Sequence, residues 1–453
     1  MTLSQNEPLA LPRNLGDGLV LRRSTPADVA ALGDFNARIH SDEGWDKPDD
    51  RLDAWTRDLL ERPHPTFGSG DFTIVEDTRT GQIVSSLNLI SQTWSYGGIP
   101  FGVGRPELVG THPEYRNRGL VRVQFDEVHR WSAARGELLQ SITGIPYYYR
   151  LFGYEMAVTL GGGRSGFSPQ VPELADGQVE AFNIRPAVEA DLPFIADVYA
   201  KGCQRYPLAC VWTLDLWRYE LNGKSERNVN RYELYTIETA AGQPAGFVAV
   251  PWFTWGETLP VKRFELAPGF SWAQVTPAVF RFLRRAYESH PWGLPGERKP
   301  FGAFDLGLGE DHPAYHVMAD HLPRKRPPYA WYIRVADLPA FIRHVTPALE
   351  RRLADSGCAG HTGELHLTFY RDGLHLVFDQ GRLTTVEAWK PVPQGHSGEA
   401  GFPERTFLQL LFGYRSLAEL KYAFPDCWTN SDSTTAVLEA LFPRQPSDIF
   451  TVS

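Results

Sequence analysis

The feature that most constrains the fold is a repeated opening. Residues 21–28 (LRRSTPAD) and residues 184–191 (IRPAVEAD) have the same order of residue types. The first copy has the pattern of a strand end followed by a helix start, because Thr25 can cap, Pro26 suits the first turn and Asp28 favours the positive end of a helix. Apolar residues at helical spacing follow both copies: Val29, Leu32, Phe35 and Ile39, then Leu192, Ile195 and Val198. We therefore expect an internal duplication.

The length of the chain supports a division into domains. It has 453 residues, more than one hydrophobic core usually serves. A glycine-rich segment at 161–166 and a polar stretch up to residue 178 predict a linker, which places the first domain at 1–165 and the second at 180–335. An amphipathic helix after residue 337 and a hairpin pattern around residues 371–373 predict a different α+β module at 336–453.

Within each copy, the pattern predicts strands and helices in alternation. In the first copy we expect strands at 72–76, 83–90, 101–110 and 138–142, with a helix through residues 121–131 that ends near Gly136. In the second copy we expect strands at 232–237 and 245–253 and a helix at 274–287. The fold class that follows is a mixed α+β or α/β arrangement.

Residues 109–121 (VGTHPEYRNRGLV) form the segment that carries chemistry. A strand ends, a loop brings Arg116 and Arg118, and a helix begins at Gly119. The free N–H groups and positive end of a helix stabilise a pyrophosphate, glycine lets the phosphate approach the backbone, and arginines supply charge. The segment predicts an anion site, and the alternative is a solvated basic turn.

A second segment, residues 149–154 (YRLFGY), follows the next predicted strand. Together the two segments resemble the GNAT superfamily of N-acetyltransferases, whose pattern is Q/R-x-x-G-x-G/A followed by Y-x-x-L/F-G-F/Y. Here Arg116-x-x-Gly119-x-Val121 departs at its last position, where a small residue is usual. Nearly the whole chain resembles the Eis-like (enhanced intracellular survival) acetyltransferases, in which two tandem GNAT domains, each a central mixed sheet with flanking helices, precede a sterol-carrier-like α+β domain.

The resemblance implies an acetyl-CoA-dependent N-acetyltransferase without a metal. It implies that only the first domain binds the cofactor, since the second copy has no paired-arginine loop around residues 266–270. Tyr149 maps onto the tyrosine that protonates the departing thiolate. The C-terminal carboxylate, here that of Ser453, is the implied base, and Glu107 is the alternative. The implied cofactor contacts are Val109, Gly110, Thr111, Arg116, Arg118, Gly119, Leu120 and Val121.

The acceptor implied by the resemblance is a small-molecule or peptide amine of a cationic compound, such as an aminoglycoside-like molecule, a polyamine or a lysine side chain. Residues 42–50 contain five carboxylates and Trp45 after the first helix, and these groups suit a cation. A solvated acidic loop is the alternative for this segment.

Histidines and cysteines are the residues that could bind a metal ion or take part in redox chemistry. His361, His366 and His375 lack a neighbouring cysteine or carboxylate set in the sequence, so we expect ordinary strand histidines. The cysteines are too few and too far apart for a disulfide framework, so we expect buried thiols: Cys203, Cys210, Cys358 and Cys427.

Charge and hydropathy exclude some partners. A net charge of −9 and a pI near 5.8 argue against nucleic acid binding. Residues 1–13 lack the pattern of a leader and no long apolar run occurs, so a cytoplasmic protein without membrane contact is expected. The resemblance further implies a homo-oligomer, up to a hexamer. Two other functions stay open, a ligand-binding protein that uses the sterol-carrier-like module and an acyltransferase that uses another acyl-CoA.

Overall fold

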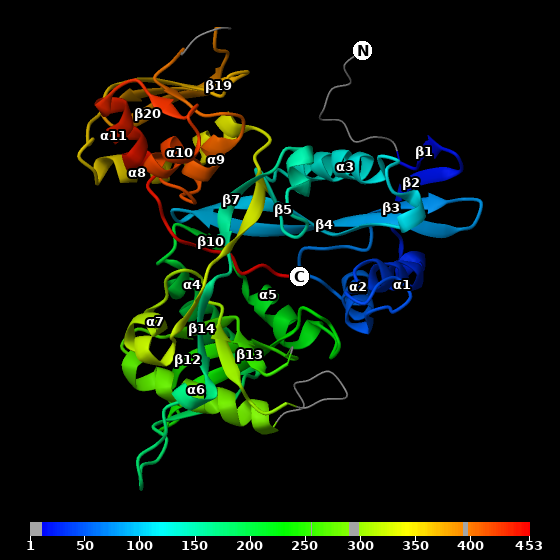
Figure 1. The fold of residues 1–453 in the computed structure, drawn as a ribbon, viewed down its shortest axis with the longest axis vertical. Helices are drawn as coiled ribbons and strands as arrows, with labels where there is room; N and C mark the ends of the chain where they lie inside the picture. Colours follow the sequence, from blue (N-terminus) through cyan, green and yellow to red (C-terminus); the bar gives the residue numbers. More distant parts are fainter. Residues whose placement is uncertain (1–10, 255, 290–298, 393–396) are drawn as a thin grey trace.

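The computed structural model describes residues 11–254, 256–289, 299–392 and 397–453 (Figure 1). The prediction made for residues 1–13 therefore lies mostly outside the described residues. Figure 1 shows a sheet with helices on both sides, a second α/β part beneath it, and a C-terminal module at the upper left. In the part of the chain that is described, no helix is long and apolar enough to cross a membrane.

The largest sheet has ten strands and comes mainly from the first copy. Its path is β1-β2-β3-β4-β5-β6-β17-β7, and β10 and β23 extend it beside β4. The bounds are β1 (Arg13–Gly16), β2 (Leu19–Arg23), β3 (Phe72–Asp77), β4 (Gln82–Tyr96), β5 (Ile99–Thr111), β6 (Leu139–Ile142), β7 (Glu155–Leu160), β10 (Leu208–Cys210), β17 (Tyr329–Arg334) and β23 (Ser447–Asp448). The four strands predicted in the first copy are confirmed as β3, β4, β5 and β6.

Helices cover both faces of this sheet. α1 (Val29–Ile39) and α2 (Asp50–Glu61) lie below it in Figure 1, and α3 (Leu120–Ala134) lies above it. α3 buries Phe125, Val128 and Trp131 of the predicted stripe, and Gly136 with φ 72° follows its end as expected.

The second copy forms two four-stranded sheets, β14-β12-β11-β9 and β13-β15-β8-β16. Their strands are β8 (Gly163–Phe167), β9 (Phe182–Pro186), β11 (Tyr232–Thr239), β12 (Pro244–Pro251), β13 (Thr258–Val261), β14 (Arg263–Leu266), β15 (Ala303–Leu306) and β16 (Arg324–Arg326). The helices are α4 (Leu192–Cys203), α5 (Leu214–Arg218), α6 (Trp272–Ser289) and α7 (Pro313–Val317). The strands and the helix predicted here are confirmed as β11, β12 and α6.

The duplication extends to individual contacts. In the first copy Arg22 pairs with Asp28 at 2.7 Å, and in the second copy Arg185 pairs with Asp191 at 2.7 Å. Each aspartate also accepts a backbone N–H from three residues earlier, at 2.8 Å in both copies. An equivalent arginine–aspartate pair thus holds the same strand-to-helix turn in each copy.

The two copies exchange strands. β17 belongs to the second copy by sequence, yet it pairs with β6 and β7 in the first sheet (Figure 1). β8 lies in the segment predicted as a linker, and that prediction is wrong for residues 163–167, because they pair with β15 and β16 in a sheet of the second copy. The chain therefore crosses over near residues 161–163 and 327–328, close to the domain divisions that the sequence predicts, and those divisions stay a prediction.

The C-terminal module is one sheet with four helices. The sheet runs β20-β19-β18-β21-β22 and contains the predicted hairpin. Its elements are α8 (Leu338–Ala354), β18 (Gly363–Thr368), β19 (Gly373–Asp379), β20 (Arg382–Trp389), β21 (Ala400–Gly401), α9 (Thr406–Leu411), α10 (Leu417–Ala423), β22 (Trp428–Thr429) and α11 (Asp432–Leu441). All four cysteines are free thiols; Cys210 and Cys427 are buried, and Cys203 and Cys358 are half-buried.

Candidate active site

β5 pairs with β4 along one edge, and its other edge is not paired with any described strand over the residues where the sequence predicts the cofactor. β5 pairs with β4 over almost its whole length, but with β6 only at Val103 and Gly104. From residue 105 to Thr111, no described strand pairs with this edge. An unpaired edge presents N–H and C=O groups to which an extended ligand can bind.

A β-bulge interrupts this open edge. Leu108 and Val109 stand opposite the single residue Leu87, and Leu108 has a positive φ of 52°. A non-glycine residue in this conformation is strained and often marks a functional site. Gly110 is required next to it, because a Cβ there would lie 2.7 Å from a methyl group of Ile39. The bulge reorients the backbone at the predicted contacts Val109 and Gly110.

The carbonyl of Gly110 is held from the opposite side. Ser85 Oγ donates to it at 2.9 Å and also lies 2.8 Å from Thr111 Oγ1. Gln124 on α3 donates to Ser85 Oγ at 2.6 Å. These buried contacts tie the end of β5 to α3 and fix the geometry of both.

The arginine loop leads from β5 into α3 as predicted. Arg116 and Arg118 are exposed, and Gly119 adopts φ 74° directly before the helix. No described atom lies within 4 Å of the position of a Cβ at Gly119, so the space above it is open. The first turn of α3 contains no acidic residue, and the N–H groups of Leu120 and Val121 have no partner within the helix. An anion is stabilised at such a helix end.

Tyr149 lies in a short 3-10 turn, η3 (Tyr148–Phe152), beyond the end of β6. Its side chain is 3% exposed. Burial, and secondly the Glu107 carboxylate, raise the pKa of Tyr149 above its ordinary value, so the phenol keeps its proton at neutral pH. Gly144 leaves room beside the hydroxyl. The ring packs against four others: Phe125, Tyr148, Tyr154 and Tyr332.

The C-terminal tail ends beside β5. Ser453 is buried at 5% exposure, and the C-terminus lies between the first sheet and the second copy (Figure 1). The Val452 carbonyl accepts from Gln92 Nε2 and from Arg105 Nη1, both at 2.9 Å. Arg105 Nη1 also donates to Ser453 Oγ at 2.7 Å. The last residue is therefore fixed against the open strand.

Upstream contacts guide the tail to this position. The ring of Phe450 stacks on Trp212 with centroids 4.6 Å apart, and Trp212 Nε1 donates to the Phe450 carbonyl at 2.6 Å. Asp448 forms a buried ion pair with Arg263 at 2.8 Å. Val452 and Ser453, which follow Phe450, are both buried.

Glu107, the alternative base, projects from the same strand. Arg105 Nη2 lies 2.5 Å from its carboxylate. The arginine therefore contacts both Glu107 and the hydroxyl of the last residue, and it balances the charge of Glu107.

The acidic segment at 42–50 is only partly available for a cation. Three of its carboxylates have basic partners within the protein: Glu43 with Lys47, Asp49 with Arg51, and Asp50 with Arg227. Asp42 and Asp46 are exposed, and no ion pair joins them to another described residue. Trp45 packs on His112 with ring centroids 4.4 Å apart, which places this segment beside the start of the cofactor loop.

Three further residues of the site have no clear signal in the sequence. Arg105 and Gln92 hold the tail, but nothing in their own strands indicates a partner at the far end of the chain. His40 follows α1 and lies against the bulge, and burial lowers its pKa to about 4. Alternation along β5 could have indicated that Arg105 and Glu107 share a face.

The second copy does not repeat the cofactor loop. Between β14 and α6 the chain runs through Ala267, Pro268, Gly269, Phe270 and Ser271. No arginine is available there for a phosphate. The geometry described above therefore occurs once per described chain.

Comparison with known proteins agrees with this geometry. Residues 38–157 match the family model described as an acetyltransferase (GNAT) domain. No curated protein sequence matches the chain. Among solved structures, a GCN5-related N-acetyltransferase from Kribbella flavida has 17% identity and a TM-score of 0.63, covering 96% of this chain and 98% of that one.

Two other solved structures have a similar fold over nearly the whole chain. A probable N-acyltransferase from Enterococcus faecalis has 14% identity and a TM-score of 0.62, with 95% and 100% of the two chains covered. Eis1 from Mycobacterium abscessus has 13% identity and a TM-score of 0.56, with 96% and 99% covered.

The bulged strand, the arginine loop and the helix end all lie within residues 38–157, the segment that the acetyltransferase (GNAT) model matches. The matched segment assigns the first copy more closely. This part of the chain is a GNAT acetyltransferase domain, and the protein is an N-acetyltransferase.

Proposed function

We propose that the protein transfers the acetyl group of acetyl-CoA to a primary amine of a cationic acceptor, with one active site in the first domain. The observation that carries this proposal is the continuous path from the open, bulged edge of β5 into the arginine loop and the amino end of α3. An extended thioester ligand fits such a strand edge, and its pyrophosphate fits the helix end.

In this proposal the backbone of Val109, Gly110 and Thr111 contacts the pantetheine arm and the acetyl carbonyl. The pyrophosphate is bound by Arg116 and Arg118 and by the backbone of Gly119, Leu120 and Val121. Val121 is larger than the residue usual at this position, but its side chain packs against the cluster that contains Phe125 and Tyr149. Its bulk therefore does not need to meet the phosphate.

The reaction requires two proton transfers. The neutral amine attacks the thioester carbonyl carbon, a C–N bond forms, and the C–S bond then breaks. We assign the proton of the amine to the terminal carboxylate of Ser453 and the protonation of the thiolate to Tyr149. The buried position and protonated state of Tyr149 support its role as the acid. The fixed position of the tail supports the role of Ser453 as the base. Glu107 is less suited because Arg105 already neutralises it.

The acceptor is proposed from the surface beside the cofactor loop. Asp42 and Asp46 offer exposed carboxylates, and Trp45 lies against His112 at the loop. An aminoglycoside-like compound, a polyamine or a lysine side chain provides a cationic group for this surface. The second domain is proposed to be structural, the C-terminal module sterol-carrier-like, and the assembly a homo-oligomer of up to six copies.

The test is a panel of amines with acetyl-CoA, in which free thiol is measured as it is released. Release that depends on an added cationic amine supports the proposal. Propionyl-CoA and a longer acyl-CoA belong in the same panel, because faster thiol release from either one would identify it, rather than acetyl-CoA, as the preferred donor. If calorimetry detects binding of none of these acyl-CoA compounds, a ligand-binding protein is favoured instead.

A further inference from the structure

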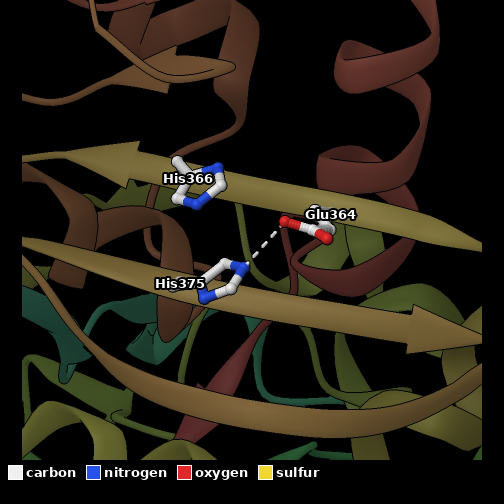
Figure 2. A group of neighbouring side chains, drawn as sticks. All are labelled: Glu364, His366 and His375. Carbon is white, nitrogen blue, oxygen red and sulfur yellow. Dashed lines mark hydrogen bonds and ion pairs between the residues drawn. The ribbon is translucent and has the colours of Figure 1, made fainter.

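Two histidines face each other on the hairpin of the C-terminal module. His366 on β18 stands directly opposite His375 on β19. Their rings stack with centroids 4.2 Å apart and planes 4° from parallel, and Figure 2 shows the two side chains on neighbouring strands. Directly opposed residues of an antiparallel pair share one face of the sheet, so the register itself brings the two imidazoles together.

A carboxylate completes this group from the same face. Glu364 precedes His366 by two residues on β18, and its Oε2 lies 3.1 Å from His375 Nε2 (Figure 2). One ligand atom from each of Glu364, His366 and His375 lies within 4.8 Å of the other two. Among the residues that the structure describes, no other cluster of this kind is present.

Further carboxylates lie behind the rings. Glu399 Oε2 is 3.2 Å from His366 Nδ1 and also accepts the His366 backbone N–H at 2.6 Å. Glu387 on β20 lies 3.8 Å from His375 Nδ1. A carboxylate at Nδ1 holds the proton on that nitrogen and leaves the lone pair of Nε2 for a ligand. His366 is therefore oriented by a hydrogen bond at Nδ1, as metal-ligating histidines usually are, whereas Glu387, 3.8 Å from His375 Nδ1, is close enough for an ion pair only.

The expectation of ordinary strand histidines rested on the lack of neighbouring carboxylates in the sequence. The fold corrects that premise, because Glu387 and Glu399 come from the next strand and from the segment before β21. Glu387 and Glu399 are distant in sequence and become adjacent only when the sheet forms, whereas Glu364 lies two residues before His366 and is visible in the sequence.

We propose that Glu364, His366 and His375 bind one divalent transition-metal ion of the Zn²⁺ class. Two imidazoles and one carboxylate favour Zn²⁺, Ni²⁺ or Cu²⁺ over Mg²⁺ or Ca²⁺, which prefer all-oxygen ligands. Solvent fills the remaining position, because the Glu364 side chain is 59% exposed. The stacked rings run parallel, so each must rotate to direct its nitrogen at a shared ion at about 2.0–2.1 Å. The ion would cross-link β18 and β19.

This site is separate from the acetyltransferase site. β19 lies at the top of the C-terminal module in Figure 1, away from the C-terminus. The outcome of a metal-binding experiment therefore does not depend on the proposed reaction.

The experiment is calorimetric titration of tag-free, chelator-treated full-length protein with Zn²⁺. We expect one ion per chain, and a loss of affinity greater than about 100-fold in His366→Gln and in His375→Gln, because each removes a ligand. Glu399→Gln should weaken binding by about 10-fold to 100-fold as an outer partner. His316→Gln is the matched control, since His316 is an exposed histidine 2.6 Å from Asp311 without a second imidazole, and it should bind like the wild type.

Two results would overturn the proposal. One is wild-type affinity for Zn²⁺ no greater than that of the double variant His366→Gln/His375→Gln. The other is equal loss of affinity in His316→Gln. Circular dichroism of every variant separates loss of the site from loss of the fold, and the absorption bands of Co²⁺-loaded wild type, absent from the double variant, give an independent measure of coordination.

Discussion

Arg105 donates a hydrogen bond from Nη1 to Ser453 Oγ at 2.7 Å, although the two residues are 348 positions apart in the sequence. The same nitrogen bonds the Val452 carbonyl, and Nη2 pairs with Glu107. One guanidinium thus joins the end of the chain to the strand that we propose binds the thioester. The bonds that Arg105 and Gln92 make to the Val452 carbonyl hold the backbone directly before the terminal residue.

Deletion of Ser453 tests the terminal carboxylate as the base. The deletion moves the carboxylate one residue back, so we expect kcat to fall by about 100-fold or more, with little change in the KM for acetyl-CoA. Ser453→Ala is the matched control, because it keeps the carboxylate and loses only the hydroxyl, and it should retain most activity. An unchanged kcat after the deletion would exclude this base.

Arg105→Gln tests the positioning of the tail. Loss of the guanidinium leaves Glu107 and the tail without their shared partner, so we expect about a 10-fold lower kcat and a lower melting temperature. Because Arg105 is proposed to act through the tail, the same substitution should have little further effect on kcat once Ser453 is deleted. Fully multiplicative effects in the double variant would mean that Arg105 acts independently.

The cofactor loop is tested by binding. Arg116→Gln and Arg118→Gln should each weaken acetyl-CoA binding by about 10-fold, and more at low salt than at high salt, because both arginines are exposed. Gly119→Val should weaken it further, since a β-branched residue resists φ 74°. Arg371→Gln, an exposed arginine of the C-terminal module, is the charge-matched control. If these three variants bind acetyl-CoA in calorimetry as tightly as the control does, the loop does not bind the cofactor.

His40 gives the protein a predictable weakness in acid. Its pKa is about 4 in the folded chain and near 6.5 when unfolded, so between these values only the unfolded chain takes up the proton. Stability is therefore lost as pH falls below 6.5, by about 2 kcal/mol at pH 5 from this residue. His40→Gln should show a smaller drop in melting temperature between pH 7 and pH 5. An identical drop in both proteins would place the acid sensitivity elsewhere.

Local patterns predicted most of the fold. The repeated strand-to-helix opening was readable because its cap residues are adjacent in sequence, and the same arginine–aspartate pair closes it in both copies. The exchange of β8 and β17 could not be predicted, since a strand that pairs in a distant domain has the same alternating pattern as one that pairs in its own domain.

The candidate site likewise has one part that the sequence could predict and another that it could not. The loop from Arg116 to Val121 is continuous in sequence, and it could be predicted directly. The contact of Arg105 with Ser453 and the position of His40 against the bulge arise from tertiary packing, which no spacing reveals. The proposed role of the terminal carboxylate rests on family resemblance alone.

The most direct test of the account is the amine-dependent release of coenzyme A by Tyr149→Phe. Tyr148→Phe is its control, because Tyr148 is a half-buried tyrosine in the same turn whose ring packs on Tyr149. The proposed role of Tyr149 predicts that kcat falls by about 100-fold or more in Tyr149→Phe, with acetyl-CoA affinity retained, and stays near wild type in Tyr148→Phe. Full activity in Tyr149→Phe would contradict it.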